Sequence, residues 1–194
     1  MEITSAMIKD LRDQSGISVM QCKRALEEAE GDMDKAKIIL KKKRSEAADK
    51  KADREIGAGC VGVYTHNTGE VAALVKLGCE TDFVSKNEEF AALANDIAMH
   101  VAAMAPSFIT RDEVSPEVIE KAKEVFAGEV ADKPADMQEK IMEGKLSAYF
   151  KDQILMEQPF VKNGDTTIEE MITGAVQKFG EKVTVVEIAR VAVK

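Results

Sequence analysis

The sequence predicts an α+β protein, in which a three-helix N-terminal domain precedes a core of helices packed on a three-stranded antiparallel sheet. Residues 1–54 contain three short runs with the apolar spacing of a helix, each preceded by a residue that can cap it. Residues 57–79 alternate between apolar and other side chains around a polar turn, as the two strands of a hairpin do. The stretch 182–193 is rich in Val and Ile and predicts the third strand.

The N-terminal helices are expected to begin after Thr4, Ser18 and Asp32. The side chains of these residues can accept hydrogen bonds from the free N–H groups of a first helical turn. Gly16 and Gly31 are expected to end the first two helices, because glycine readily adopts the left-handed conformation that follows many helices. We therefore predict a compact helical domain at the start of the chain.

Two features of this domain allow more than one interpretation. Ile17, Val19 and Met20 cannot all face so small a core. Either at least one of them is a core residue, or the segment is an exposed apolar loop that docks on a partner.

The third helix continues into the charged run 41–54, where its apolar stripe fades. That run predicts either a solvated arm or a contact with an acidic surface.

Composition and charge indicate a globular protein with two parts. Hydrophobic residues make up 45% of the 194 residues and charged residues 32%, which is typical of a folded chain. The net charge of −8 argues against direct binding of nucleic acid through its phosphates. Residues 1–54 carry 13 Lys and Arg against 11 Asp and Glu, and the remainder carries 14 against 24. We therefore divide the chain into a helical head, 1–54, and an acidic α+β core, 55–194.

The sequence contains no signal for a membrane span, a signal peptide or a metal site. It lacks an apolar run of 18 residues, and its first residues lack the cationic and apolar segments of a signal peptide. Cys22, Cys60 and Cys79 do not have the spacing of a metal site. We expect them to be reduced thiols in a cytoplasmic protein.

The core is expected to place strands at 57–66, 71–79 and 182–193. In the second strand, alternate residues from Val71 to Cys79 are apolar and should share one face. In the third strand, simple alternation puts four valines on one side: Val183, Val185, Val191 and Val193. Val186 and Ile188 then lie on the other side, so both faces of the sheet are partly apolar. We infer that both are covered, one by helices and the other most simply by a second copy of the chain.

Four helices are expected between the second and third strands. Their predicted starts are the capping-box spacing at Ser85, the Ser115-Pro116 pair, a point near Pro134, and the Thr166-Thr167 pair. The segments 106–115 and 156–166 are predicted to be irregular.

A short segment, 78–84, joins the second strand to the first of these helices. Such a corner lies at the surface and places Phe83 and Val84 beside Asp82 on a tight bend. One interpretation is that Phe83 packs back on the helix as a hydrophobic staple. The other is that the corner presents Phe83 to a partner.

No catalytic constellation accompanies this corner. The two histidines, His66 and His100, have no nucleophile near them in the sequence, and no glycine-rich phosphate loop precedes a helix. The sequence therefore favours a binding protein over an enzyme.

Several motifs, in their order along the chain, resemble those of the elongation factor Ts family. The Thr81-Asp82-Phe83-Val84 tetrapeptide after a strand looks like the signature of that family. LRDQSGISVMQCKRAL resembles its N-terminal helical domain, which is of the ubiquitin-associated type. IAMHVAAMAPSFI, EKIMEGKLSAYF and QPFV resemble the later half of its core. The resemblance covers essentially the whole chain.

This resemblance implies a non-enzymatic guanine-nucleotide exchange factor for elongation factor Tu, without a cofactor, that promotes release of GDP and Mg²⁺ in translation. It assigns Phe83 as a wedge beside the Mg²⁺ site of the partner, Asp82 as a perturbing charge, and Thr81 and Val84 as residues that hold the bend. The resemblance also implies further contacts with the partner, from the head and from a core helix: Val19, Met20, Lys23 and His100.

The resemblance also bears on oligomeric state. Long members of the family carry two related core subdomains and an inserted helical hairpin. In this sequence the Thr81–Val84 signature and the helix of His100 belong to one helix-and-sheet unit. Short members similarly form homodimers, which agrees with the two-sided sheet inferred from the strand pattern.

Two other functions are compatible with parts of the sequence. A ribosome- or chaperone-associated interaction module could use the three-helix head to bind a peptide, but would leave Asp82 and Phe83 without a role. A thiol enzyme could use Cys60 or Cys79, although nothing in their spacing favours it.

Overall fold

The computed structural model describes residues 3–131 and 134–193 and confirms the expected α+β class. The head consists of α1 (Ser5–Ser15), α2 (Val19–Glu28) and α3 (Met33–Asp49). All three predicted caps are present: Thr4, Ser18 and Asp32 each accept a backbone N–H of the first turn. The buried core of the head comes from residues 11–40 alone. The head thus has its own small core, separate from that of the sheet.

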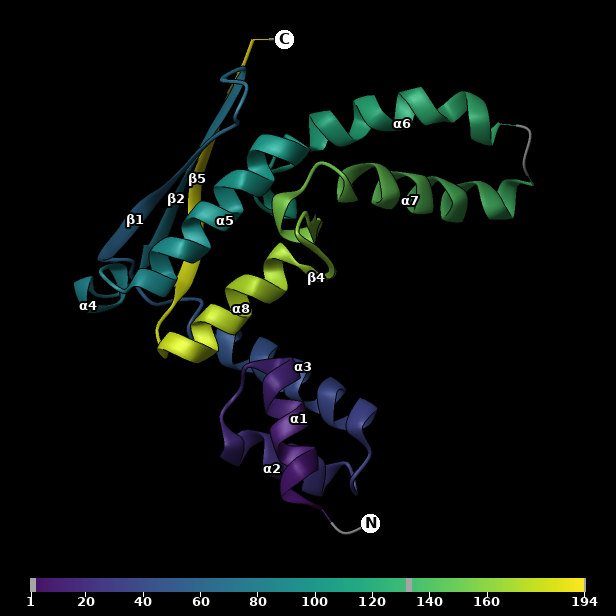
Figure 1. Cartoon of the computed structure of the whole chain (residues 1–194). Helices are drawn as coiled ribbons and strands as arrows, with labels where there is room; N and C mark the ends of the chain where they lie inside the picture. Colours follow the sequence, from purple (N-terminus) through teal and green to yellow (C-terminus); the bar gives the residue numbers. More distant parts are fainter. Residues whose placement is uncertain (1–2, 132–133, 194) are drawn as a thin grey trace.

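The charged end of α3 lies against α8 (Ile168–Phe179) of the core. Lys41 forms an ion pair of 2.5 Å with Glu170, and Arg44 donates to the side chain of Gln177 and to the backbone carbonyl of Ser15. The structure therefore supports the second interpretation of this run, with the acidic surface supplied by the same chain. Figure 1 shows α3 meeting α8 where the head joins the core.

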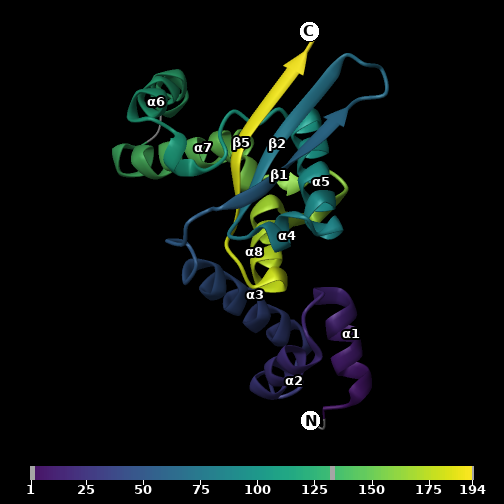
Figure 2. The same cartoon turned by 90° about the vertical axis from the view of Figure 1, so that its left-hand side faces the viewer.

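Three strands form the main sheet in the order β1-β2-β5, and both pairings are antiparallel. They are β1 (Ala58–Thr65), β2 (Val71–Cys79) and β5 (Val183–Ala192), which confirms the predicted hairpin and third strand. Figure 2 shows the strands side by side above the head. A two-stranded ribbon of β3 (Pro159–Phe160) and β4 (Asn163–Thr167) takes up much of 156–166 and ends one residue beyond it, so the prediction that this segment is irregular is partly wrong.

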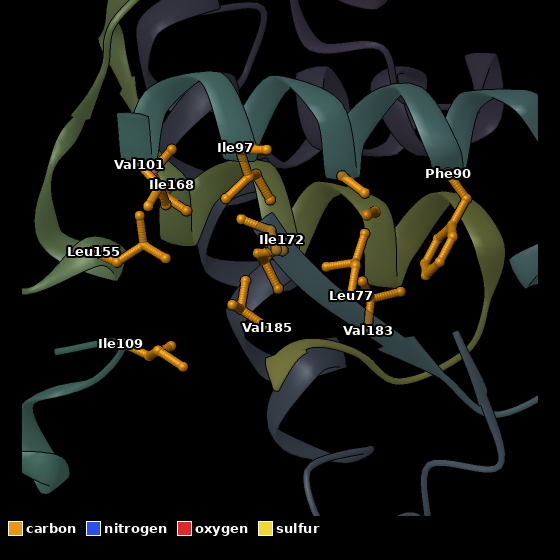
Figure 3. Close-up of a cluster of buried hydrophobic side chains, with 14 of the residues drawn as sticks. Leu77, Phe90, Ile97, Val101, Ile109, Leu155, Ile168, Ile172, Val183 and Val185 are labelled. Atoms are coloured by element: carbon orange, nitrogen blue, oxygen red, sulfur yellow. The ribbon is translucent and has the colours of Figure 1, made fainter. Parts of the chain in front are cut away.

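Helix α5 (Glu88–Met104) covers the inner face of the sheet. It approaches β1 so closely that a Cβ added at Gly62 would lie 2.2 Å from the backbone of Ala94, which explains the glycine in mid-strand. The main core lies between the sheet, α5 and α8. Figure 3 shows some of its side chains, from these elements and from the segments at 109 and 155: Leu77, Phe90, Ile97, Val101, Ile109, Leu155, Ile168, Ile172, Val183 and Val185.

The side chains of β5 do not alternate as predicted, because the strand contains a bulge. Leu77 of β2 pairs with Val185, whereas Lys76 pairs with Glu187, so Val186 is an extra residue on β5. The inserted residue reverses the alternation beyond it. Ile188 therefore pairs opposite inward-facing Val75, and Val191 lies on the outer face with its neighbours. The prediction that Val191 and Val193 share a side with Val183 and Val185 is wrong for this reason.

The outer face of the sheet is exposed and carries many apolar side chains, together with the cross-strand pair Lys76 and Glu187. Val61 and Val63 of β1, Leu74 of β2, and Val191 of β5 all present large side chains to solvent there. In Figure 1, no helix among the described residues covers this face. The apolar pattern that predicted a two-sided sheet is present, and the helices of the described residues cover only one side.

Helices α6 (Pro116–Val130) and α7 (Ala135–Lys151) form a hairpin that projects from the core instead of packing on the sheet (Figure 1). Ser115 caps α6 as predicted, with Pro116 at its first position. Thr167, one of the two threonines predicted to start the last helix, caps α8 and forms a capping box with Glu170. Ser85 does not cap α5, because Asn87 does so and Ser85 ends the short helix α4 (Asp82–Ser85). Within the described residues, no helix is long and apolar enough to cross a membrane.

Candidate functional site

The corner between β2 and α5 presents a large aromatic side chain to solvent. Phe83 is the second residue of α4, and its exposed fraction is 83%, the highest among the large exposed apolar residues of the described chain. Val84, the next residue, is buried in the main core. Val84 therefore anchors the turn, and the interpretation of Phe83 as a staple on its own helix does not hold.

Two carboxylates tie this corner to the loop between α8 and β5. Glu181 accepts the backbone N–H of Thr81 at 3.0 Å and the Thr81 hydroxyl at 2.5 Å. In return, Glu80 accepts the backbone N–H of Lys182 at 2.5 Å and a hydrogen bond from Arg54 at 3.2 Å. The hydrogen bond from Lys182, aided by Arg54, holds the pKa of Glu80 below its ordinary value. We call these contacts the Glu80–Glu181 clamp.

The sequence analysis assigned no role to either glutamate. Glu80 directly precedes the Thr81–Val84 signature, but Glu181 is about a hundred positions away and has no signal beyond following Gly180, the C-cap of α8. Only the pairing of β2 with β5 brings them together, because Cys79 and Val183 form the last pair of that ladder. The clamp therefore extends the ladder with side-chain acceptors.

Asp82 adds a negative charge beside Phe83. It receives a hydrogen bond of 2.6 Å from Lys86, one turn further along, and is otherwise exposed to solvent. The contact with Lys86 holds the pKa of Asp82 below its usual value, so the carboxylate is ionised at neutral pH. The corner thus presents an aromatic ring and an anionic group together.

The head presents a second exposed surface. Val19, Met20 and Lys23 lie on one face of α2, at spacings of three and four residues, and all three are exposed. Ile17, by contrast, is buried in the core of the head. Ile17 is therefore the core residue of this segment, and Val19 and Met20 are its exposed apolar residues, although they lie in a helix and not in a loop.

His100 lies in the interior and not at either surface. Its Nδ1 accepts the backbone N–H of Val161 at 3.2 Å, so Nε2 carries the proton and donates to Gln158 at 2.8 Å. Burial lowers the pKa of His100. The imidazole thereby holds both ends of the Gln158–Val161 segment, away from the Phe83 corner.

This arrangement predicts a stability change near neutral pH. The pKa of His100 is lower in the folded state than in the unfolded state, where it is about 6.5. The contribution of neutral His100 to the free energy of unfolding is therefore complete above about pH 6.5 and is lost as the pH falls below that value. We expect the free energy of unfolding to decrease by up to about 1.4 kcal/mol per pH unit below that point. Urea unfolding at pH 7.5 and 5.5 measures it.

The matched variants for this test are His100→Gln and His66→Gln, which remove the only two histidines of the chain in turn. His66 is exposed at the end of the β1–β2 hairpin. The His100→Gln variant should have a similar free energy of unfolding at both pH values. The His66→Gln variant should still lose stability between the higher and the lower pH. An equal pH dependence in both variants would show that His100 is not its source.

The thiols are poorly suited to catalysis. Burial raises the pKa of Cys60, and burial together with the nearby Glu181 raises the pKa of Cys79. A higher pKa leaves less of the reactive thiolate. Within 3–131 and 134–193, no group of His, Cys, Asp and Glu is arranged to hold a metal ion.

Comparison with known proteins gives one consistent family. Residues 49–194 match the family model described as "Elongation factor TS". The chain is 45% identical over 195 aligned positions to elongation factor Ts of Fervidobacterium nodosum, which covers 100% of this chain and 99% of that protein. It is 46% identical to the Carboxydothermus hydrogenoformans protein of the same name, over 94% of this chain and 85% of the relative. The elongation factor Ts of Thermosipho melanesiensis is also 46% identical, over 94% of each chain.

Proposed function

The chain belongs to the elongation factor Ts family, and we propose that it is the exchange factor that releases GDP and Mg²⁺ from elongation factor Tu. The observation that carries this proposal is an aromatic ring held in solvent on an anchored corner, at Phe83. Such a factor performs no covalent chemistry of its own. Because its partner works in translation, we expect it to act in the cytoplasm.

The corner is proposed to act as a wedge. Phe83 enters the partner beside its Mg²⁺ site, and the ionised Asp82 disturbs the surroundings of the ion. Thr81, bound by Glu181, and Val84, buried in the core, keep the bend in place. The factor then binds nucleotide-free elongation factor Tu more tightly than the GDP form. Thermodynamic linkage requires GDP to weaken binding of the factor by the same ratio.

A comparison of free energies indicates that the Phe83 ring does not act alone. Accelerating GDP release by about a thousandfold requires about 4 kcal/mol. Burying one aromatic side chain supplies roughly 1.5–3 kcal/mol. We propose that the head supplies the rest through Val19, Met20 and Lys23, which lie on the nucleotide-binding domain of the partner.

His100 is proposed to contribute to partner binding indirectly. Its ring is buried, and both nitrogens are used within the chain. It therefore supports the Gln158–Val161 segment, whose Val161 side chain is exposed and available to a different domain of the partner.

The direct test is release of a fluorescent GDP analogue from purified elongation factor Tu, followed by stopped flow with and without this protein. We expect a large acceleration that saturates with factor concentration. An unrelated GTPase loaded with the same analogue is the control and should show no acceleration. An unchanged rate with elongation factor Tu would refute the function.

We also propose that two copies associate through the outer face of the sheet. A large exposed apolar patch usually marks an interface, and this one spans all three strands. A two-fold arrangement would bury the same patch on both copies. No cysteine lies on β5, so an interface through that strand would be non-covalent.

A charged substitution in this patch is expected to give monomers. Val63→Glu would place a carboxylate opposite Leu74, in the middle of the face, where burial without a partner is unfavourable. Light scattering at micromolar concentration should show twice the monomer mass for the wild type and the monomer mass for the variant. Val125→Glu on α6, also exposed but far from the sheet, is the control. A monomeric wild type would contradict the proposed dimer.

A further inference from the structure

The Glu80–Glu181 clamp is reciprocal. The carboxylate of Glu80, on the β2 side, accepts the backbone N–H of Lys182, and the carboxylate of Glu181, on the β5 side, accepts the backbone N–H of Thr81. Each strand end thus supplies one backbone donor and one anionic acceptor to the other. Charge-assisted hydrogen bonds of this kind are stronger than those between neutral groups.

The clamp also includes the end of the head. Arg54 donates to Glu80, and the ammonium group of Lys182 donates to the backbone carbonyls of Ala52 and Arg54, at 2.5 and 2.9 Å. Three segments that are distant in sequence therefore meet directly beside α4. Several bonds arranged in one network hold a backbone more firmly than an isolated surface ion pair does.

Thr81 is the residue that this network holds most directly. It is the N-cap of α4, yet its side chain makes no capping hydrogen bond; its hydroxyl donates to Glu181. The residue before the first turn determines the direction in which that turn leaves the strand. Phe83 is two residues further on, so a change in the backbone at Thr81 redirects the ring.

We propose that Glu181 is a positioning residue for exchange: by holding Thr81, it keeps Phe83 in the orientation that enters the partner. This inference rests on the proposed exchange function. Glu181 itself need not touch the partner. Its loss should reduce the rate at saturation more than the affinity, because the head and the rest of the core still bind.

The test uses the full chain with Glu181→Ala, Glu181→Gln and, as a control, Glu70→Ala, which removes an exposed carboxylate from the distant hairpin turn. Amide hydrogen exchange of the free protein measures how firmly the Thr81 N–H is held. Stopped-flow GDP release over a range of factor concentrations separates the maximal rate from the half-saturating concentration.

For Glu181→Ala we expect Thr81 exchange at least about tenfold faster, a maximal release rate about tenfold lower, and a half-saturating concentration changed less than about threefold. Glu181→Gln keeps one acceptor oxygen and should lie between Glu181→Ala and the wild type. Glu70→Ala should match the wild type. In a Phe83→Ala background, Glu181→Ala should cause no further loss, since no ring remains to be positioned.

The two measurements distinguish a failure of the clamp from a failure of the positioning role and from a failure of the wedge mechanism. Unchanged Thr81 exchange in Glu181→Ala would overturn the clamp, whatever the release rate. Faster Thr81 exchange with normal release, while Phe83→Ala is still defective, would overturn the positioning role and leave the proposed function standing. Normal release in Phe83→Ala would count against the wedge mechanism itself, and the Thr81 measurement would still report on the clamp.

Discussion

Replacing Phe83 with alanine should slow factor-stimulated GDP release from elongation factor Tu by about ten- to hundredfold. That range is the rate equivalent of the roughly 1.5–3 kcal/mol gained when an aromatic side chain is buried. The folded state should be unaffected, because the ring is 83% exposed and the buried anchor of the turn is Val84. Stopped-flow release of a fluorescent GDP analogue, at saturating factor, measures the effect.

Phe83→Leu is the matched variant for this experiment. Leucine keeps an apolar side chain of smaller area at the same position, so its release rate should lie between those of the wild type and Phe83→Ala. Thermal unfolding of all three proteins should coincide within error. Equal release rates in the three proteins would remove Phe83 from the mechanism.

Changing Met20 to aspartate should weaken the complex with nucleotide-free elongation factor Tu by about tenfold or more. Met20 is 61% exposed at the start of α2, so the charge costs little in the free protein. In the proposed complex the carboxylate would be buried against an apolar surface without a partner, which is unfavourable by about 1–3 kcal/mol. Isothermal titration calorimetry measures the dissociation constant.

Ile38→Asp is the control for the head. Ile38 is 68% exposed on α3 and belongs to the same small domain, but lies outside the proposed contact surface. It should bind like the wild type. If Ile38→Asp weakens binding as much as Met20→Asp does, the contact is not localised to α2. If neither variant weakens it, the head does not contact the partner.

Local chemistry explains why much of the fold could be predicted. Thr4, Ser18 and Asp32 cap their helices as expected, since a cap depends only on the residue and the N–H groups that directly follow it. The β1–β2 hairpin followed from alternation across a short turn. A surface corner at 78–84 was predicted because a strand end and a helix start lie close together in the sequence, but the sequence left open whether Phe83 is exposed and the helix was expected to begin at Ser85.

Features that depend on distant segments could not be predicted in this way. The bulge at Val186 arises from the pairing of β5 with β2, and one extra residue reverses which valines face the core. The role of Glu181 requires knowing that the α8–β5 loop lies beside Thr81. His100 looked like a candidate surface contact until the fold placed it next to Gln158 and Val161.

The central claim is that the side chain at position 83 leaves solvent and enters elongation factor Tu. The chain contains no tryptophan, so Phe83→Trp introduces a single indole at that point. We predict that acrylamide readily quenches this indole in the free protein. In the nucleotide-free complex, after subtraction of the emission of the partner, quenching should fall severalfold with a shift of the emission to shorter wavelength. Equal quenching in the free protein and in a complex verified to be fully formed would contradict the account.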